Sequence, residues 1–87
     1  MDNTLKLIVL DWIPSQSKVI DFGCGDGALL KILSEQKSII GYGVENDPDK
    51  INACIINGVS VIQQDIDAGI HNYKGMGFDV AVMASSI

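Results

Sequence analysis

A glycine-rich run flanked by acids is the segment of this sequence best suited to binding chemistry. Residues 19–27 read Val-Ile-Asp-Phe-Gly-Cys-Gly-Asp-Gly, so an apolar stretch leads to Asp21, and Asp26 lies among the glycines. Glycines at alternate positions allow a sharp turn and let the backbone approach a ligand with no side chain in between. No Lys or Arg lies between Lys18 and Lys31. A loop with this charge repels a pyrophosphate and attracts a cation.

A ligand with an amine, a sulfonium and a neutral adenosine matches that charge, so the loop predicts binding of S-adenosylmethionine. NAD is the alternative, because residues 23–28 also satisfy the loose dinucleotide pattern G-x-G-x-x-G/A. Three acids favour the methyl donor. Asp21 and Asp26 lie at the loop, and Asp65 follows the third predicted strand.

Further binding residues are expected where the other strands end, since ligands of open α/β sheets lie beyond the carboxyl ends of the strands. Glu45 ends the second predicted strand, 22 residues after the first loop glycine, and its two oxygens suit the two ribose hydroxyls. Asp65 is positioned to accept from the adenine amine. Asn46 and Ile66 are expected on the two faces of the adenine ring, and Met83 near the amino group of the ligand.

Within the glycine-rich run, the predicted cofactor-binding residues are Gly23, Cys24 and Gly25. Cys24 is interpreted as a small residue that fills tight space, because no neighbouring His or Lys lowers the pKa of its thiol. Asp26 and Asp47 are interpreted as acids at helix starts. The sequence identifies no catalytic residue and no set of metal ligands.

Apolar periodicity and turn residues divide the chain into alternating helices and strands. Helices are predicted over 4–13, 28–36 and from 48 to a stop signal at 57–58. Strands are predicted over 18–22, 39–45, 59–63 and 78–84. The alternation predicts an α/β fold, a Rossmann-like doubly wound parallel sheet in the order 3-2-1-4 with helices on both faces.

The helical patterns also predict which side chains face the core. The stripe of the first helix passes through Leu5, Ile8, Val9 and Trp12. The inner positions of the second and third helices are Leu29, Ile32 and Leu33, and Ile51, Cys54 and Ile55, respectively.

The fourth predicted strand, 78–84, is apolar on both faces, as in the centre of a sheet. Only three residues follow it, and an unpaired apolar edge is a feature that proteins avoid. The sequence therefore predicts that residues 1–87 form one S-adenosylmethionine-binding domain that lacks its C-terminal half.

Composition excludes several classes of partner. The 87 residues carry a net charge of −5, which argues against nucleic acid because phosphate neutralisation needs a basic face. No apolar stretch approaches membrane-spanning length, and the N-terminus lacks the pattern of a signal peptide. With two cysteines and no disulfide framework, the expected location is the cytoplasm.

The chain resembles the class I S-adenosylmethionine-dependent methyltransferases and, within them, the MetW family of methionine biosynthesis proteins. The superfamily shares the glycine-rich run, whereas Gly-Tyr-Gly-Val-Glu at 41–45 and Ala-Cys-Ile at 53–55 are more specific to MetW. The resemblance implies ligand-binding roles for Asp21, Gly23, Gly25, Glu45 and Asp65. It also implies association with the homoserine O-acyltransferase of methionine synthesis. The family runs to about twice this length, and the sequence departs from its usual ending after the fourth strand.

Two functions of different classes remain open. One is a cofactor-binding subunit that acts by docking on a biosynthetic enzyme, and the sequence favours it slightly because no general base or acceptor pocket is visible. The other is an active methyltransferase with an unknown small-molecule acceptor, since methyl transfer depends on positioning more than on acid–base chemistry.

Overall fold

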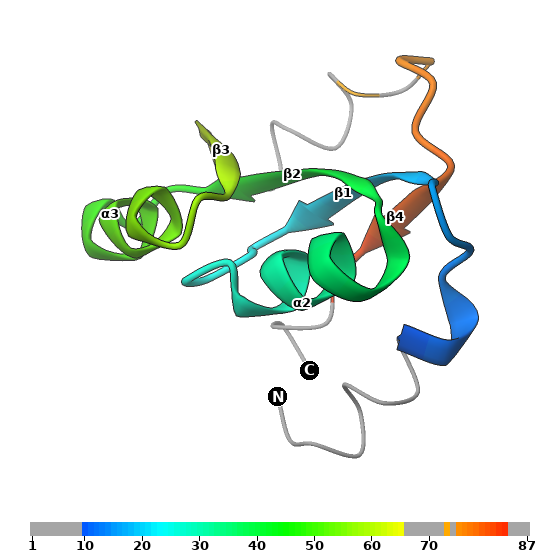
Figure 1. Ribbon diagram of the computed structural model, residues 1–87. Coiled ribbons are helices and arrows are strands. Elements are labelled where there is room, and N and C mark those ends of the chain that lie inside the picture. The colour runs from blue at the N-terminus through cyan, green and yellow to red at the C-terminus, as the bar shows by residue number, and fades with distance from the viewer. Residues whose placement is uncertain (1–9, 66–72, 74, 84–87) are drawn as a thin grey trace.

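The computed structural model describes residues 10–65, 73 and 75–83 (Figure 1). Its elements are β1 (Lys18–Phe22), α2 (Ala28–Lys37), β2 (Ile40–Glu45), α3 (Pro48–Ile56), β3 (Ser60–Gln63) and β4 (Val80–Val82). Residues 10–12, the described end of the predicted first helix, are helical. The predicted alternation is confirmed, with β4 shorter than expected.

The four strands form one parallel sheet in the order β3-β2-β1-β4, as predicted. The chain moves outward from β1 through α2 to β2 and through α3 to β3. It then returns to pair β4 with the free side of β1 (Figure 1). This reversal places the topological switch point between β1 and β4, where doubly wound sheets bind ligands beyond the strand ends.

The two described helices share one face of the sheet. Leu30 and Leu33 of α2 and Cys54 of α3 belong to a single buried cluster. On the opposite face, a second cluster of β1 and β2 side chains packs against Tyr73 and Phe78 from the segment that returns to β4. Within the described residues, helices therefore cover one face, whereas the sequence predicted helices on both.

Two glycines in β2 determine how α2 packs. A Cβ at Gly41 would lie 3.1 Å from a methyl group of Leu30, and a Cβ at Gly43 would lie 3.4 Å from the other. Leu30 fills the space above both glycines and is 2% exposed. The prediction that Ile32 faces inward was wrong. Because Gly41 and Gly43 have no side chains, Leu30 packs against the sheet, and Ile32 is left half-buried.

Two other inward assignments were also wrong. Ile55 is 63% exposed, because α3 rests on the sheet through a narrow contact at Cys54. Trp12 is 78% exposed, since the helical turn before β1 presents Leu10 and Ile13 to the core instead. The rest of that first stripe, Leu5, Ile8 and Val9, lies outside the described residues. No helix within the described ranges is long and apolar enough to cross a membrane.

Candidate functional site

The glycine loop, residues 23–27, joins β1 to α2 and is hydrogen-bonded to the end of β2. The N–H groups of Gly23 and Cys24 both donate to the carbonyl of Val44, at 2.7 and 3.2 Å. At the middle of the loop, Gly25 has a φ of 61°, in the left-handed region that side chains disfavour. A Cβ at Gly25 would meet nothing within 4 Å. The loop is thus held at its start and borders open space at its centre.

The carboxylate of Glu45 connects the glycine loop to the start of α3. Its Oε1 accepts from the N–H of Gly25 at 3.0 Å, and its Oε2 accepts from the N–H groups of Asn46 and Asp47, both at 3.1 Å. Glu45 is 7% exposed, so these three donors, and not water, stabilise its charge. A carboxylate has about four acceptor positions. Capacity therefore remains for a hydroxyl of a ligand.

Asp21 is the penultimate residue of β1, and one of its carboxylate oxygens is unsatisfied. It is 2% exposed, and its Oδ1 has no hydrogen-bond partner among the described residues. Burial, and secondarily the charge of Glu45, raises the pKa of Asp21 from 3.8 to about 7. A buried acceptor without a donor costs about 1–3 kcal/mol. A ligand that brings an N–H donor or a positive charge to this position would offset that cost.

Two side chains, one from α3 and one from the residue after it, hold the other side of the glycine loop. The Sγ of Cys54 donates to the carbonyl of Gly25 at 3.0 Å and lies 3.7 Å from the Sγ of Cys24. The Nδ2 of Asn57 donates to the carbonyl of Asp26 at 3.0 Å. The sequence predicted Cys54 as a core residue and Asn57 as a helix stop, and assigned neither to the site. These contacts join residues 29 and 31 positions apart, so no local spacing indicates them.

Neither thiol is suited to nucleophilic chemistry. Burial and the hydrogen bond with Cys54 raise the pKa of the Cys24 thiol far above its usual range, and burial also raises the pKa of Cys54. The reactive form of cysteine is the thiolate, which this environment disfavours. The position of Cys24 agrees with the interpretation that it fills tight space, because a Cβ on Gly43 would collide with its Sγ.

Both acids at the helix starts accept from backbone N–H groups there: Asp47 is the N-cap of α3, and Asp26 directly precedes Gly27, the N-cap of α2. The Oδ1 of Asp26 accepts from the N–H of Ala28 at 3.0 Å. The Oδ1 of Asp47 accepts from the N–H of Asp49 at 3.0 Å. Both bonds satisfy N–H groups that a helix start leaves without partners, so these two carboxylates have structural roles.

The remaining predicted binding residues lie after the other strands. Asn46, Asp65 and Met83 follow β2, β3 and β4 at the same edge of the sheet, and all three are exposed. Ile66 lies outside the described residues. Their predicted positions around adenine and the ligand's amino group therefore stay predictions.

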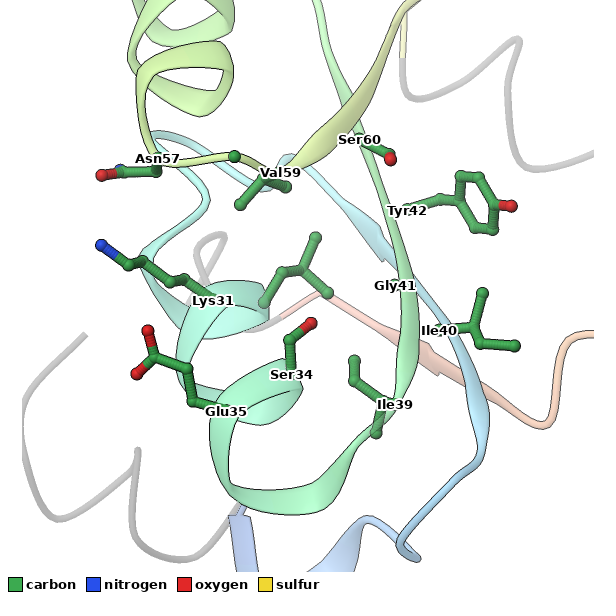
Figure 2. A pocket seen from close by; sticks show the side chains of 12 residues that line it. Lys31, Ser34, Glu35, Ile39, Ile40, Gly41, Tyr42, Asn57, Val59 and Ser60 are labelled. Carbon is green, nitrogen blue, oxygen red and sulfur yellow. The ribbon is translucent and has the colours of Figure 1, made fainter.

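The opposite edge of the sheet carries a groove of about 450 Å³ (Figure 2). Its floor includes Leu30, Ile39 and Val59, and Figure 2 shows Lys31 and Glu35 of α2 pointing away from it. The groove lies where β2 and β3 begin, so it is separate from the edge that holds Asp21 and Glu45. Within the described part of the chain, no three His, Cys, Asp or Glu side chains gather as metal ligands.

Comparison with known proteins connects this geometry to a family. The model of the family described as Methionine biosynthesis protein MetW matches residues 4–87. The bifunctional methionine biosynthesis protein MetXA/MetW of Rhodopirellula baltica is 28% identical over an alignment 87 positions long, and this alignment covers 91% of this chain and 14% of that protein. The chain thus spans a small part of the length of this curated relative.

Solved structures share the fold. A SAM-dependent methyltransferase from Geobacter sulfurreducens in complex with S-adenosyl-L-homocysteine matches with a TM-score of 0.60 and 21% identity, over 71% of this chain and 27% of that one. A TehB-like SAM-dependent methyltransferase from Corynebacterium glutamicum gives a TM-score of 0.61 and 22% identity, over 69% and 33%. The Streptococcus pneumoniae protein Sp1610 matches with a TM-score of 0.76 and 16% identity, over 97% of this chain and 40% of that one. The chain has the Rossmann-like methyltransferase fold and spans less than half of each structure.

Proposed function

Because the chain belongs to the MetW family of methionine biosynthesis proteins, we propose that it binds S-adenosylmethionine at the glycine loop and acts together with a homoserine O-acyltransferase. The fold and the two buried acids at one sheet edge support the first part. The name of the Rhodopirellula relative, which joins MetXA with MetW, supports the second.

The unsatisfied oxygen of Asp21 is the observation that carries the cofactor assignment. Asp21 and Glu45 are both almost fully buried, and no Lys or Arg lies between residues 19 and 30 to balance them. An anionic pyrophosphate would add a third negative group, so NAD fits poorly. The amine and sulfonium of S-adenosylmethionine bring positive charge, which would lower the pKa of Asp21 and supply the missing donor.

The other predicted residues extend the same site. Glu45 accepts from the ribose hydroxyls through its remaining acceptor capacity. Asp65 accepts a hydrogen bond from the adenine amine, and the adenine ring lies between Asn46 and Ile66. Met83 offers its carbonyl to the ligand's amino group, beside Asp21 at the switch point.

Titration calorimetry on the full chain tests the cofactor. S-adenosylmethionine should bind and NAD should not. Asp21→Asn should weaken binding of S-adenosylmethionine about tenfold or more, the effect of losing a charge-assisted hydrogen bond. Glu35→Gln removes the same charge from an exposed position on α2 and should leave affinity unchanged. Tighter binding of NAD than of S-adenosylmethionine would refute the assignment.

The partner is tested with the homoserine O-acyltransferase of the same source. The two proteins should sediment as one complex, and the chain should increase acyltransferase activity. We place this role in the cytoplasm, where the two free, buried thiols stay reduced. Separate sedimentation, together with transfer of the cofactor's methyl group to a small molecule by the chain alone, would favour the alternative of an active methyltransferase.

A further inference from the structure

We propose that Cys54 of α3 and Asn57, which directly follows α3, are positioning residues that set the conformation of the glycine loop for cofactor binding. The identity of the cofactor rests on the proposed function, whereas the loop conformation does not. Each residue donates one hydrogen bond to a loop carbonyl. No local sequence pattern assigns either residue to the site.

The middle of the loop is held from both sides. The N–H of Gly25 donates to Glu45 at 3.0 Å, and its carbonyl accepts from the Sγ of Cys54 at 3.0 Å. The next carbonyl, that of Asp26, accepts from Asn57 at 3.0 Å. The C=O and the following N–H of a trans peptide point in opposite directions. Fixing two successive carbonyls towards α3 therefore directs the N–H groups of Asp26 and Gly27 away from it.

A glycine-rich segment needs such external bonds. Glycine adopts left-handed and right-handed backbone regions with similar ease, so the loop sequence by itself does not select one conformation. Gly27 packs against Val59 and Cys54 at the end of the loop, whereas the open space around Gly25 means that packing does not select the conformation of the middle of the loop. The hydrogen bonds from α3 supply the selection.

The chemistry of each donor fits this role. Cys54 is fully buried, and burial raises the pKa of its thiol, so Sγ keeps the proton that it donates. Asn57 lies in the turn between α3 and β3, at the rim of the groove and beside the segment leading into α2 (Figure 2). The two donors lie three residues apart at the C-terminal end of α3, so one end of this helix contacts two successive carbonyls of the loop.

Two substitutions with matched controls test the proposal on the full chain. Cys54→Ala and Asn57→Asp each remove a donor with little change in volume. Cys54→Ser restores a donor, and Asn52→Asp makes the same chemical change at an exposed position of α3. Amide hydrogen exchange over residues 22–28, without ligand, reports loop conformation, and calorimetry with S-adenosylmethionine reports affinity.

Cys54→Ala and Asn57→Asp should speed exchange in the loop selectively and lower affinity about fivefold to tenfold, the effect of one neutral hydrogen bond. Cys54→Ser should restore most of the slow exchange and most of the affinity. Asn52→Asp should change neither the exchange rate in the loop nor the affinity. If Cys54→Ala does not fold, the serine variant and Asn57→Asp decide. Unchanged exchange in the loop, or equal acceleration across the sheet, would overturn the proposal. Selective acceleration in a protein that binds no S-adenosylmethionine would support the positioning role and refute the cofactor assignment.

Discussion

The carboxyl and amino edges of the sheet, where the parallel strands end and begin, differ in how deeply their polar side chains are buried. At the carboxyl edge, where the strands end, Asp21 and Glu45 are 2% and 7% exposed. At the amino edge, Lys31, Ser34 and Glu35 line the groove but are exposed to water. Water satisfies the exposed set at no cost to folding, whereas burying a charge costs free energy unless partners replace the water.

Burying these two acids at the carboxyl edge therefore costs folding free energy, and the fold itself does not require acids at these positions. Glu45 is compensated by three backbone donors, but the Oδ1 of Asp21 is not compensated among the described residues. Unsatisfied buried groups of this kind mark sites shaped for a ligand more than for stability. We therefore base the proposed binding site on the state of the buried acids and not on the volume of the groove.

The largest expected difference between the edges concerns two glycines. Gly25 and Gly77 both have a left-handed φ, 61° and 80°, and a Cβ at either meets nothing within 4 Å. A valine is strained in this region. Gly25→Val should abolish S-adenosylmethionine binding, because its side chain enters the open space at the glycine loop. Gly77→Val, at the amino edge before β4, should lose similar stability and keep binding. Equal affinity of the two variants in calorimetry would show that the edges do not differ.

A second prediction concerns pH. The folded protein keeps a proton on Asp21 up to pH about 7, whereas the unfolded chain releases it near 3.8. Between these values the folded state binds more protons, so stability should fall as pH rises, by about 1.4 kcal/mol per pH unit and about 4 kcal/mol at most. Urea unfolding at several pH values measures this slope. Asp21→Asn should flatten the dependence of the free energy of unfolding on pH. If the slope persists in this variant, other titratable groups cause it.

The third prediction contrasts two glutamates. Glu45→Ala should weaken S-adenosylmethionine binding by about 1.5–3 kcal/mol, the size of a lost charge-assisted hydrogen-bonding site. Glu35→Ala removes the same group from the amino edge and should have no effect. Circular dichroism checks that both variants stay folded. Unchanged affinity in a folded Glu45→Ala protein would show that this carboxylate neither binds the ribose nor positions the loop for the cofactor.

The smallest expected effect concerns packing under α2. A Cβ at Gly43 would collide with the Sγ of Cys24, and its distance to Cys24 Cβ would be 2.9 Å. A Cβ at Gly41 would meet the Cδ1 of Ile39 at 3.0 Å and the Cδ2 of Leu30 at 3.1 Å, both ends of flexible side chains. Gly43→Ala should cost about 1–2 kcal/mol and Gly41→Ala less than about 1 kcal/mol in chemical unfolding. The reverse order would contradict a tighter carboxyl edge.

The fold could be predicted from the sequence because its signals are local. Glycines after an apolar strand, Asp47 followed by Pro48, and alternating periodicities fixed the elements and the strand order. The errors come from tertiary packing. Ile32 and Ile55 satisfy helical spacing, but the phase of a helix depends on the surface that receives it. For α2 that surface includes Gly41 and Gly43, which lie under Leu30, and α3 contacts the sheet mainly through Cys54.

The site could be predicted only in part. The positions of Asp21 and Glu45 follow from where strands end in a parallel sheet. The roles of Cys54 and Asn57 could not be foreseen, since each touches a loop that precedes it by about thirty residues. Likewise, the sequence offered Glu45 only as a ribose ligand. It gave no indication that backbone groups of the loop and of α3 already occupy most of its carboxylate.

The unsatisfied oxygen of Asp21 also has a consequence for selection. In a library in which residue 21 is randomised, screening for abundance alone should enrich asparagine and small apolar residues, because the acid makes the folded state less stable at neutral pH. On the proposed role in methionine synthesis, screening the same library for growth without methionine should restore the acid. The ratio of aspartate frequencies in the two screens would then measure how much fitness depends on ligand binding, with no binding assay needed.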